Sequence, residues 1–484
     1  MKDTKFILSI DGGGFRGLIP SIILSEIEKR VTNEIKKDHP GVDIRCADLF
    51  DIISGTSTGS MIALGLSIPD AENNRPKLDA QYIVDFYKDH GYDVFPDYSP
   101  IMFVDKLLSK TDKLLTAYAE KESVEVEESI KNLTEKELKK VGLLKRFFSI
   151  SRKKTSVTES KVDVVTMKKV DAVTMNKVDA VTMNKVDITT MNKVAVTTMN
   201  KVDVTTMNKV NITPKINDST MSEADKEKEK EYFTEVLMYL KGYANAYNPW
   251  KPKYLPNKFE ELLQESFEQT KLKDTVNKVT VIVPSYNITN GEYTFFTSNN
   301  PEHENLFMKD VIRASAAAPS YFPAGKIGSN YFVDGGVFSN NPTVMAYLEA
   351  KRMFPNSKFV VFSLGTGYYK EPLEDYKDSG IIQWIRPLID LLFNSELDNN
   401  DTTMKLLAKI DGTTYHRIQL NLSKDDSSLD SVSEKEVTKL TNLANDVIND
   451  LNDTYKFNDI INLLVDKCRK KNIFPIGNKS GTAK

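Results

Sequence analysis

The stretch LFDIISGTSTGSMIAL, residues 49–64, places a serine between an apolar strand and a helix. Leu49 to Ile53 predict a buried strand, and the apolar residues after Gly59 have helical spacing. In this context the G-x-S-x-G pattern from Gly55 to Gly59 is typical of a nucleophile elbow. Such a turn strains the serine backbone, and the flanking glycines leave room for the strand and the helix. We therefore predict that Ser57 is a nucleophile.

A glycine-rich turn lies upstream, where DGGGFRG at residues 11–17 follows an apolar strand at residues 5–10 and precedes a helix from about Leu18. Glycines let the backbone approach a ligand, and amides at a helix N-terminus point toward negative charge. An oxyanion hole is the favoured interpretation. A dinucleotide site remains an alternative because Gly12, Gly14 and Gly17 match G-x-G-x-x-G, although no strand end about 20 residues on carries an acid. A purely structural turn is the third interpretation of this segment.

A serine nucleophile needs a base to take its proton. None of the four histidines stands in a tight apolar or glycine motif: His39, His90, His303 and His416. YFVDGG at residues 331–336 instead places Asp334 at the end of an apolar strand, before Gly335 and Gly336. Asp-Gly-Gly also occurs in plain hairpin turns, so the aspartate and the histidines both remain candidates.

Further strands are predicted at residues 279–283, 331–333 and 358–364, and helices at 18–36, 60–67, 257–267 and 342–352. Strands that alternate with helices predict an α/β fold with a central, mostly parallel sheet. Functional groups are then expected at the carboxyl ends of the strands.

A long insertion interrupts this pattern at residues 101–248, which are rich in Lys, Glu and Ser. Within it, at about 162–211, a methionine recurs every eight residues from Met167 to Met207, in the unit Lys-Val-Asp-x-x-Thr-Met-x. This period fits neither heptads nor repeat folds of 20 to 50 residues, so the composition predicts a solvated spacer, with a short stacked β-arrangement as the alternative. The chain is thus divided into a core of residues 1–100 and 249–475, the insertion, and a tail at 476–484.

Composition excludes several classes of protein. The net charge of −3 leaves no basic excess for a nucleic-acid backbone, so no nucleic-acid partner is expected. Two cysteines exclude a disulfide framework, and no His/Cys cluster or calcium-loop spacing predicts a metal, so no cofactor is expected. The apolar stretch from Phe6 to Ile10 is too short for a cleavable secretory signal, and no run is long enough to cross a bilayer. We expect a soluble chain, cytoplasmic as synthesised.

Five ordered blocks resemble the patatin-like phospholipases: DGGGFRG at 11–17, GTSTG at 55–59, ASAAAPSYFP at 314–323, DGG at 334–336 and SLGTG at 363–367. The resemblance implies a patatin-like α/β hydrolase fold and a dyad of Ser57 and Asp334 without histidine. It also implies an oxyanion hole built from Gly12, Gly13 and Gly14, with Arg16 adding positive charge. The motifs are supported by Gly55, Gly59, Gly335 and Gly336. The insertion accounts for the wide separation of the dyad residues.

The substrate that this resemblance implies is a phospholipid or lysophospholipid acyl ester, so transient membrane contact is expected, and an activating protein partner is a further option. Two segments are candidates for lipid contact. Residues 141–154 mix bulky apolar and basic side chains as interfacial helices do, with a helix packed on the core as the alternative. Residues 381–393 are instead predicted to form a core helix, because the resemblance implies a helix there. A lysine- and asparagine-rich chain of this kind also resembles patatin-like enzymes of intracellular bacteria, which implies secretion into a host cytosol. A dinucleotide enzyme and a non-catalytic lipid-binding module are the alternatives.

Overall fold

The computed structural model describes residues 3–70, 75–98, 250–370, 372–450 and 454–475, with a few isolated positions between 234 and 246. The chain divides into two compact units, one of residues 1–96 and 256–484 and the other of residues 97–255. Nearly all of the predicted insertion, its octapeptide repeat, the segment 141–154 and the tail at 476–484 lie outside the described residues. The predictions for them stay predictions.

An eight-stranded sheet forms the centre of the first unit, in the order β5-β6-β3-β2-β1-β7-β8, with β4 also paired to β3. The pairs among β3, β2, β1, β7 and β8 are all parallel, while β4, β5 and β6 pair antiparallel. The strands are β1 (Thr4–Ile10), β2 (Ile52–Gly55), β3 (Thr280–Asn287), β4 (Glu292–Thr297), β5 (Gly325–Ile327), β6 (Asn330–Asp334), β7 (Lys358–Leu364) and β8 (Thr414–Ile418). The prediction of an α/β fold with a mostly parallel sheet is confirmed.

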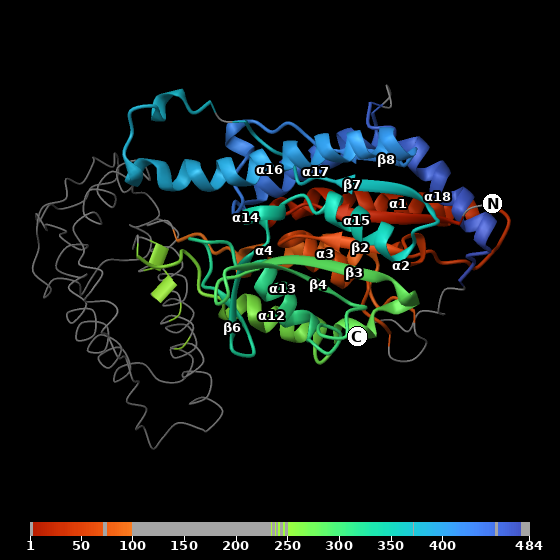
Figure 1. Ribbon diagram of the computed structural model, residues 1–484, viewed down its shortest axis with the longest axis horizontal. Helices are drawn as coiled ribbons and strands as arrows, with labels where there is room; N and C mark the ends of the chain where they lie inside the picture. Colours follow the sequence, from red (N-terminus) through yellow and green to blue (C-terminus); the bar gives the residue numbers. More distant parts are fainter. Residues whose placement is uncertain are drawn as a thin grey trace, which may run out of the picture. The chain divides into compact units, whose positions relative to one another are not determined.

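Helices cover both faces of this sheet (Figure 1). Because the side chains of a strand alternate between the two faces, the strands contribute to two separate hydrophobic cores. Leu8 and Ile10 of β1 belong to the larger core, whereas Ile7 belongs to a second core beneath α15, which lies over β1 and β2 (Figure 1). In the continuously described ranges, the helices of more than one turn are α1 (Leu18–Lys36), α3 (Thr58–Gly65), α4 (Ala80–Val94), α12 (Asn257–Phe267), α13 (Met308–Ser315), α15 (Thr343–Met353), α16 (Ile381–Asp411), α17 (Glu434–Ile448) and α18 (Phe457–Lys471). The short α2 (Cys46–Leu49) and α14 (Gly336–Ser339) each complete a single turn.

Three strand ends converge where the sequence predicted functional groups. Ile10 at the end of β1 is in register with Gly55 of β2 and with Leu364 of β7. The glycine loop, the serine turn and the SLGTG turn therefore begin side by side. Asp334 reaches the same region from β6, where it pairs with Ser285 of β3.

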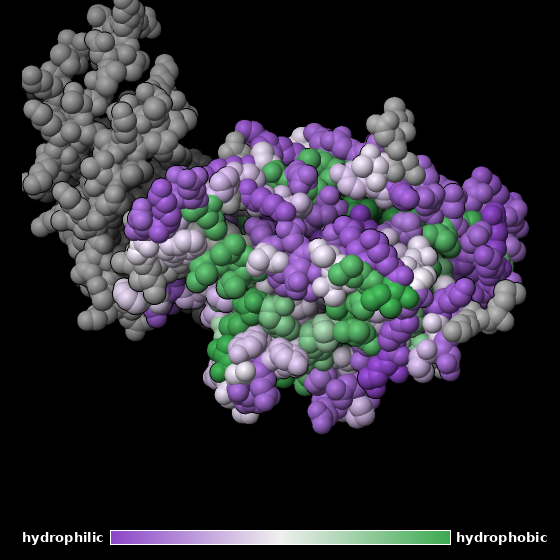
Figure 2. Space-filling model, turned by 45° about the horizontal axis from the view of Figure 1, so that its top comes forward, coloured by the Kyte–Doolittle hydropathy of each residue, from purple (hydrophilic) through white to green (hydrophobic). Residues whose placement is uncertain are grey.

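The prediction of a core helix at residues 381–393 is wrong for three of its leucines. The helix forms and continues to Asp411 as α16, but Leu388, Leu391 and Leu392 are each more than two-fifths exposed. On the face shown in Figure 2, polar residues cover most of the coloured surface and hydrophobic residues gather in patches between them. Within the described residues, no helix combines the length and the apolar character that crossing a bilayer requires.

Candidate active site

Ser57 stands in a strained turn between β2 and α3. Its φ of 55° and ψ of −121° lie in a region that residues with a side chain rarely adopt. A Cβ on Gly55 would stand 2.0 Å from the carbonyl oxygen of Gly59, and a Cβ on Gly59 would stand 2.4 Å from that of Ile10. Both positions therefore require glycine, and Ser57 remains partly open to solvent.

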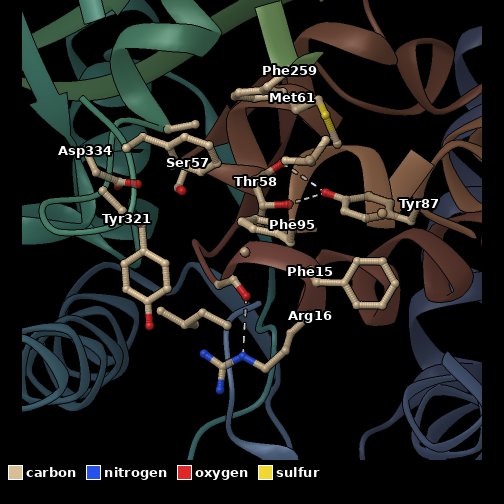
Figure 3. A pocket seen from close by; sticks show the side chains of 18 of the residues that line it. Phe15, Arg16, Ser57, Thr58, Met61, Tyr87, Phe95, Phe259, Tyr321 and Asp334 are labelled. Atoms are coloured by element: carbon tan, nitrogen blue, oxygen red, sulfur yellow. Dashed lines mark hydrogen bonds between the residues drawn. The ribbon is translucent and has the colours of Figure 1, made fainter. Parts of the chain in front are cut away.

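Asp334 is only 2% exposed and lies beside this serine. Its carboxylate accepts a hydrogen bond from the Gly336 amide at 2.7 Å, and the Ser57 side chain lies next to it. Burial raises the pKa of Asp334 to about 7, although the bonds from Ser57 and Gly336 lower it. The close-up in Figure 3 shows the two side chains pointing toward one another. A buried carboxylate that titrates near neutral pH is suited to accept a proton from the serine.

Ser315 links the backbone of Ser57 to the segment that follows Asp334. Sequence analysis assigned this residue no role. Its hydroxyl accepts a hydrogen bond from the Ser57 amide at 3.0 Å and donates one to the Pro284 carbonyl at 2.7 Å. Its own carbonyl accepts from the Gly335 amide at 3.3 Å. One buried residue thus fixes the strained backbone of the nucleophile and the segment that follows Asp334. The ASAAAPSYFP block pointed to this segment, but not to this hydroxyl.

Ser315→Ala should lower kcat about 10- to 100-fold and destabilise the fold by about 1–2 kcal/mol, because the buried Ser57 amide and the Pro284 carbonyl lose their partner. If the Ser57 hydroxyl then moves away from Asp334, the pKa of Asp334 rises and the ascending limb of the pH–rate profile shifts to higher pH. Ser67→Ala is the matched control, since it also removes one fully buried hydroxyl, there bonded to the Ala63 carbonyl at 2.8 Å. Equal rates for both variants would leave Ser315 without a role in positioning.

The glycine loop offers two backbone amides rather than three. The Gly12 amide donates to the Asn340 carbonyl at 3.0 Å, so it supports the loop instead of facing a ligand. Among the described residues, the amides of Gly13 and Gly14 have no hydrogen-bond acceptor. Gly14 has a φ of 59°, and a Cβ there would stand 2.1 Å from the Leu429 carbonyl oxygen. Of the three glycine amides predicted to form an oxyanion hole, those of Gly13 and Gly14 are therefore available to a ligand, and the hole itself stays a prediction.

Side chains from the C-terminal third hold this loop in place. Nη1 and Nη2 of Arg417 both donate to the fully buried Asp11 carboxylate, Nη1 at 2.8 Å, and Nη1 also donates to the Ser363 hydroxyl at 2.7 Å. The Thr366 hydroxyl donates to the Gly12 carbonyl at 2.7 Å. Sequence analysis missed both contacts. Only the SLGTG block, which contains Ser363 and Thr366, could have pointed to them.

Arg16 is buried, but its guanidinium faces backbone carbonyls. Its Nε donates to the Gly13 carbonyl at 3.4 Å and its Nη1 to the Ser427 carbonyl at 3.2 Å. In Figure 3 the guanidinium points away from Ser57. This arrangement ties the glycine loop to the segment that contains Leu429, whose carbonyl accepts from the Phe15 amide at 2.8 Å. A direct role of Arg16 in stabilising charge stays a prediction.

Arg16→Ala should lower kcat about tenfold, which is less than the 10²- to 10³-fold typical of losing a direct oxyanion donor. The expected cause is a looser Gly13–Gly14 turn together with the loss of one nearby positive charge. Steady-state kinetics on a soluble ester should show a larger fall in kcat than rise in KM. An unchanged kcat would reduce Arg16 to a support of the fold.

An apolar pocket opens beside Ser57 and Asp334. It encloses about 840 Å³ of empty space, which includes solvent at its mouth, and both Ser57 and Asp334 line it (Figure 3). Most of the remaining lining is apolar or aromatic, with contributions from Met61, Phe95, Phe259, Tyr321, Phe322 and Phe393. Such a lining suits a hydrocarbon chain.

Three of the four histidines lie away from this pocket. His39 stacks on Phe474, His416 stacks on Phe362, and His303 accepts a hydrogen bond from a backbone amide. His90 does line the pocket, but its Nδ1 lies 3.2 Å from an oxygen of Asp93. Within the described part of the chain, no group of three or more His, Cys, Asp or Glu side chains is arranged to hold a metal ion.

Comparison with known proteins agrees with this geometry. A family model described as patatin-like phospholipase matches residues 8–347. Patatin-like protein 2 of Oryza sativa subsp. indica is 23% identical over 477 residues, which cover 90% of this chain and 82% of the relative. Patatin-B1 of Solanum tuberosum is 44% identical over 103 residues, which cover 21% of this chain and 25% of the relative.

Among solved structures, VipD from Legionella pneumophila matches 91% of this chain and 67% of its own at 12% identity, with a TM-score of 0.24, too low to support an argument. The family model, in contrast, covers most of the chain and includes the glycine loop, the serine turn and Asp334. The chain therefore belongs to the patatin-like phospholipase family, which implies lipid acyl hydrolase activity.

Proposed function

We propose that the protein is a phospholipase of the A type, which hydrolyses acyl esters of phospholipids or lysophospholipids through a Ser57–Asp334 dyad. The observation that carries the proposal is that a serine in a strained elbow faces a buried aspartate and that both line an apolar pocket. No histidine is assigned to the reaction.

In the proposed reaction, Asp334 accepts the Ser57 proton while the serine oxygen bonds to the ester carbonyl carbon. The amides of Gly13 and Gly14 donate to the negatively charged oxygen of the tetrahedral intermediate. The bond to the leaving alcohol then breaks, and Asp334 returns the proton to that alcohol. Water attacks the acyl-enzyme with Asp334 again as the base, which releases the fatty acid and restores the Ser57 hydroxyl.

The apolar pocket supports an acyl chain as the part of the substrate that enters the protein. The phospholipid headgroup would then remain near the mouth and in contact with the lipid aggregate. Transient membrane contact and action without a metal or other cofactor are parts of this proposal. An activating partner and secretion into a host cytosol stay predictions from the sequence.

Two alternatives from the sequence are weakened. Family membership removes the support for a dinucleotide enzyme, because the same glycine loop has another use in this family. A non-catalytic lipid-binding module would not require an aspartate whose pKa lies near neutrality beside a strained serine. No contact among the described residues favours either alternative.

A panel of fluorogenic esters and phospholipids, hydrolysed by purified protein beside Ser57→Ala, tests the proposed function. The wild type should hydrolyse both substrates, and the variant neither, because the alanine has no oxygen to carry the acyl group. The same rates are expected in chelator, since no metal takes part. Activity that vanishes in chelator and returns with calcium would contradict the metal-free mechanism.

A further inference from the structure

We propose that one face of the first half of α16 is the surface on which the protein docks to lipid, and that it favours zwitterionic or uncharged lipid over anionic lipid. The proposal rests on the proposed function, because a lipid acyl hydrolase must reach a substrate held in an aggregate. The surface consists of Leu388, Leu391 and Leu392 and is called the leucine face.

The spacing of these leucines places them together on one side of the helix, since residues three and four apart are neighbours on a helix. They are 47%, 41% and 45% exposed. The same helix buries Leu397 and Met404, so it has an inward side that packs on the sheet and an outward side that keeps its leucines. A cluster of exposed leucines is a mark of an interaction site rather than of an ordinary surface.

The turn of α16 that carries the leucine face also borders the active-site pocket. Phe393 follows Leu392 in the helix and lines the pocket together with Ser57 and Asp334. A Cβ placed on Gly336 would stand 3.2 Å from the Phe393 ring and 3.1 Å from an Asp334 oxygen, so the ring borders the same small space as the carboxylate. One turn of α16 therefore carries both the leucine face, on its exposed side, and a pocket residue on its inward side, so lipid held at the leucines lies close to the pocket.

Charges beside the leucine face select the kind of lipid. The segment before α16 packs against the start of this helix. The Nε1 of Trp384 in α16 donates to the carbonyl of Tyr376 in that segment at 3.1 Å. That segment, PLEDYKDSG at residues 372–380, exposes three carboxylates and one lysine. Anionic lipid attracts basic clusters, so an acidic margin disfavours it. Apolar contact, which needs no anionic headgroup and is little screened by salt, is then the main attraction.

The test uses the full chain and compares Leu391→Ser/Leu392→Ser with the matched control Leu406→Ser/Ile410→Ser. The control residues are also exposed, at 55% and 81%, but lie on the same helix roughly 20–30 Å farther along at about 1.5 Å per residue. Phosphatidylcholine vesicles, with and without phosphatidylserine, serve as binding partner and substrate beside a soluble ester. We expect the ratio of vesicle to soluble-ester hydrolysis to fall at least tenfold in the first variant and to stay within twofold of wild type in the control.

Wild-type binding to phosphatidylcholine vesicles should be no weaker than to vesicles with phosphatidylserine, and it should survive high salt. An unchanged hydrolysis ratio in the Leu391→Ser/Leu392→Ser variant, or salt-sensitive binding that requires phosphatidylserine, would overturn the proposal. If the double variant fails to fold, Leu388→Gln carries the same comparison. Wild-type protein that hydrolyses neither substrate would refute the proposed function, while vesicle sedimentation would still decide whether the leucine face binds lipid.

Discussion

Asp334→Asn should reduce ester hydrolysis roughly 10²- to 10⁴-fold, the range typical of losing a general base. The substitution keeps the size of the side chain and an acceptor for the Gly336 amide, but it removes the group that takes the Ser57 proton. Initial rates on a soluble ester measure the effect without the complication of vesicle binding. His90→Gln is the matched control, because it changes the histidine of the same pocket and should cost less than tenfold.

The pH dependence of the wild type follows from the same carboxyl. Asp334 acts as a base only when deprotonated, so kcat/KM should rise with pH through a pKa of about 7 and then level off. Near-normal turnover by folded Asp334→Asn protein, or a profile with no limb near neutrality, would remove Asp334 from the mechanism.

The free energy of unfolding should fall as pH rises, whereas kcat/KM should increase. The folded-state pKa of Asp334 is raised above its ordinary value of 3.8, so its contribution to stability is fully present below that value and is lost as pH rises through about 7. The difference of about three pKa units corresponds to a cost of about 4 kcal/mol at alkaline pH. Asp334→Asn should therefore melt at a higher temperature than the wild type at pH 8, and the gain should shrink toward pH 4.

Arg417→Leu should have the largest effect on stability, a loss of about 3–5 kcal/mol in the free energy of unfolding. Asp11 is fully buried, and the variant would leave its carboxylate without the guanidinium that now binds both of its oxygens. The same change should lower ester hydrolysis, since Asp11 begins the loop that carries Gly13 and Gly14. Urea unfolding measures the first effect.

The double variant Asp11→Asn/Arg417→Leu separates the effect of an unpaired buried charge on stability from the effect of the ion pair on hydrolysis. It removes the uncompensated charge, so much of the lost stability should return, while hydrolysis should remain impaired because the loop has still lost its anchor. An Arg417→Leu protein with the urea midpoint of the wild type would show that the pair does not hold the loop.

Some parts of the site could be predicted from sequence because they are local. The serine elbow is a continuous strand, turn and helix, and its glycines are required by backbone contacts within that unit and with the end of β1. Asp334 was recognisable at the end of an apolar strand. The parallel sheet was predictable because the alternation of strands and helices is also a local pattern in the sequence.

Other parts depend on which strands become neighbours. Arg417 reaches Asp11 only because β8 pairs with β7 and β7 with β1, an order that no local period encodes. The Ser315 hydroxyl binds an amide 258 residues away in the chain. For α16, the apolar run predicted a helix correctly, but its exposure depends on what packs against it. Much of the support for the glycine loop comes from beyond residue 347, where the family match ends.

Covalent labelling with a lipid-like fluorophosphonate tests the central claim most directly, because this reagent stays attached to an activated serine. Peptide mapping by mass spectrometry should find the adduct on Ser57, and labelling should slow markedly in Asp334→Asn at the same pH. Labelling of another residue, or equal labelling rates in wild type and Asp334→Asn, would contradict a Ser57 nucleophile activated by Asp334.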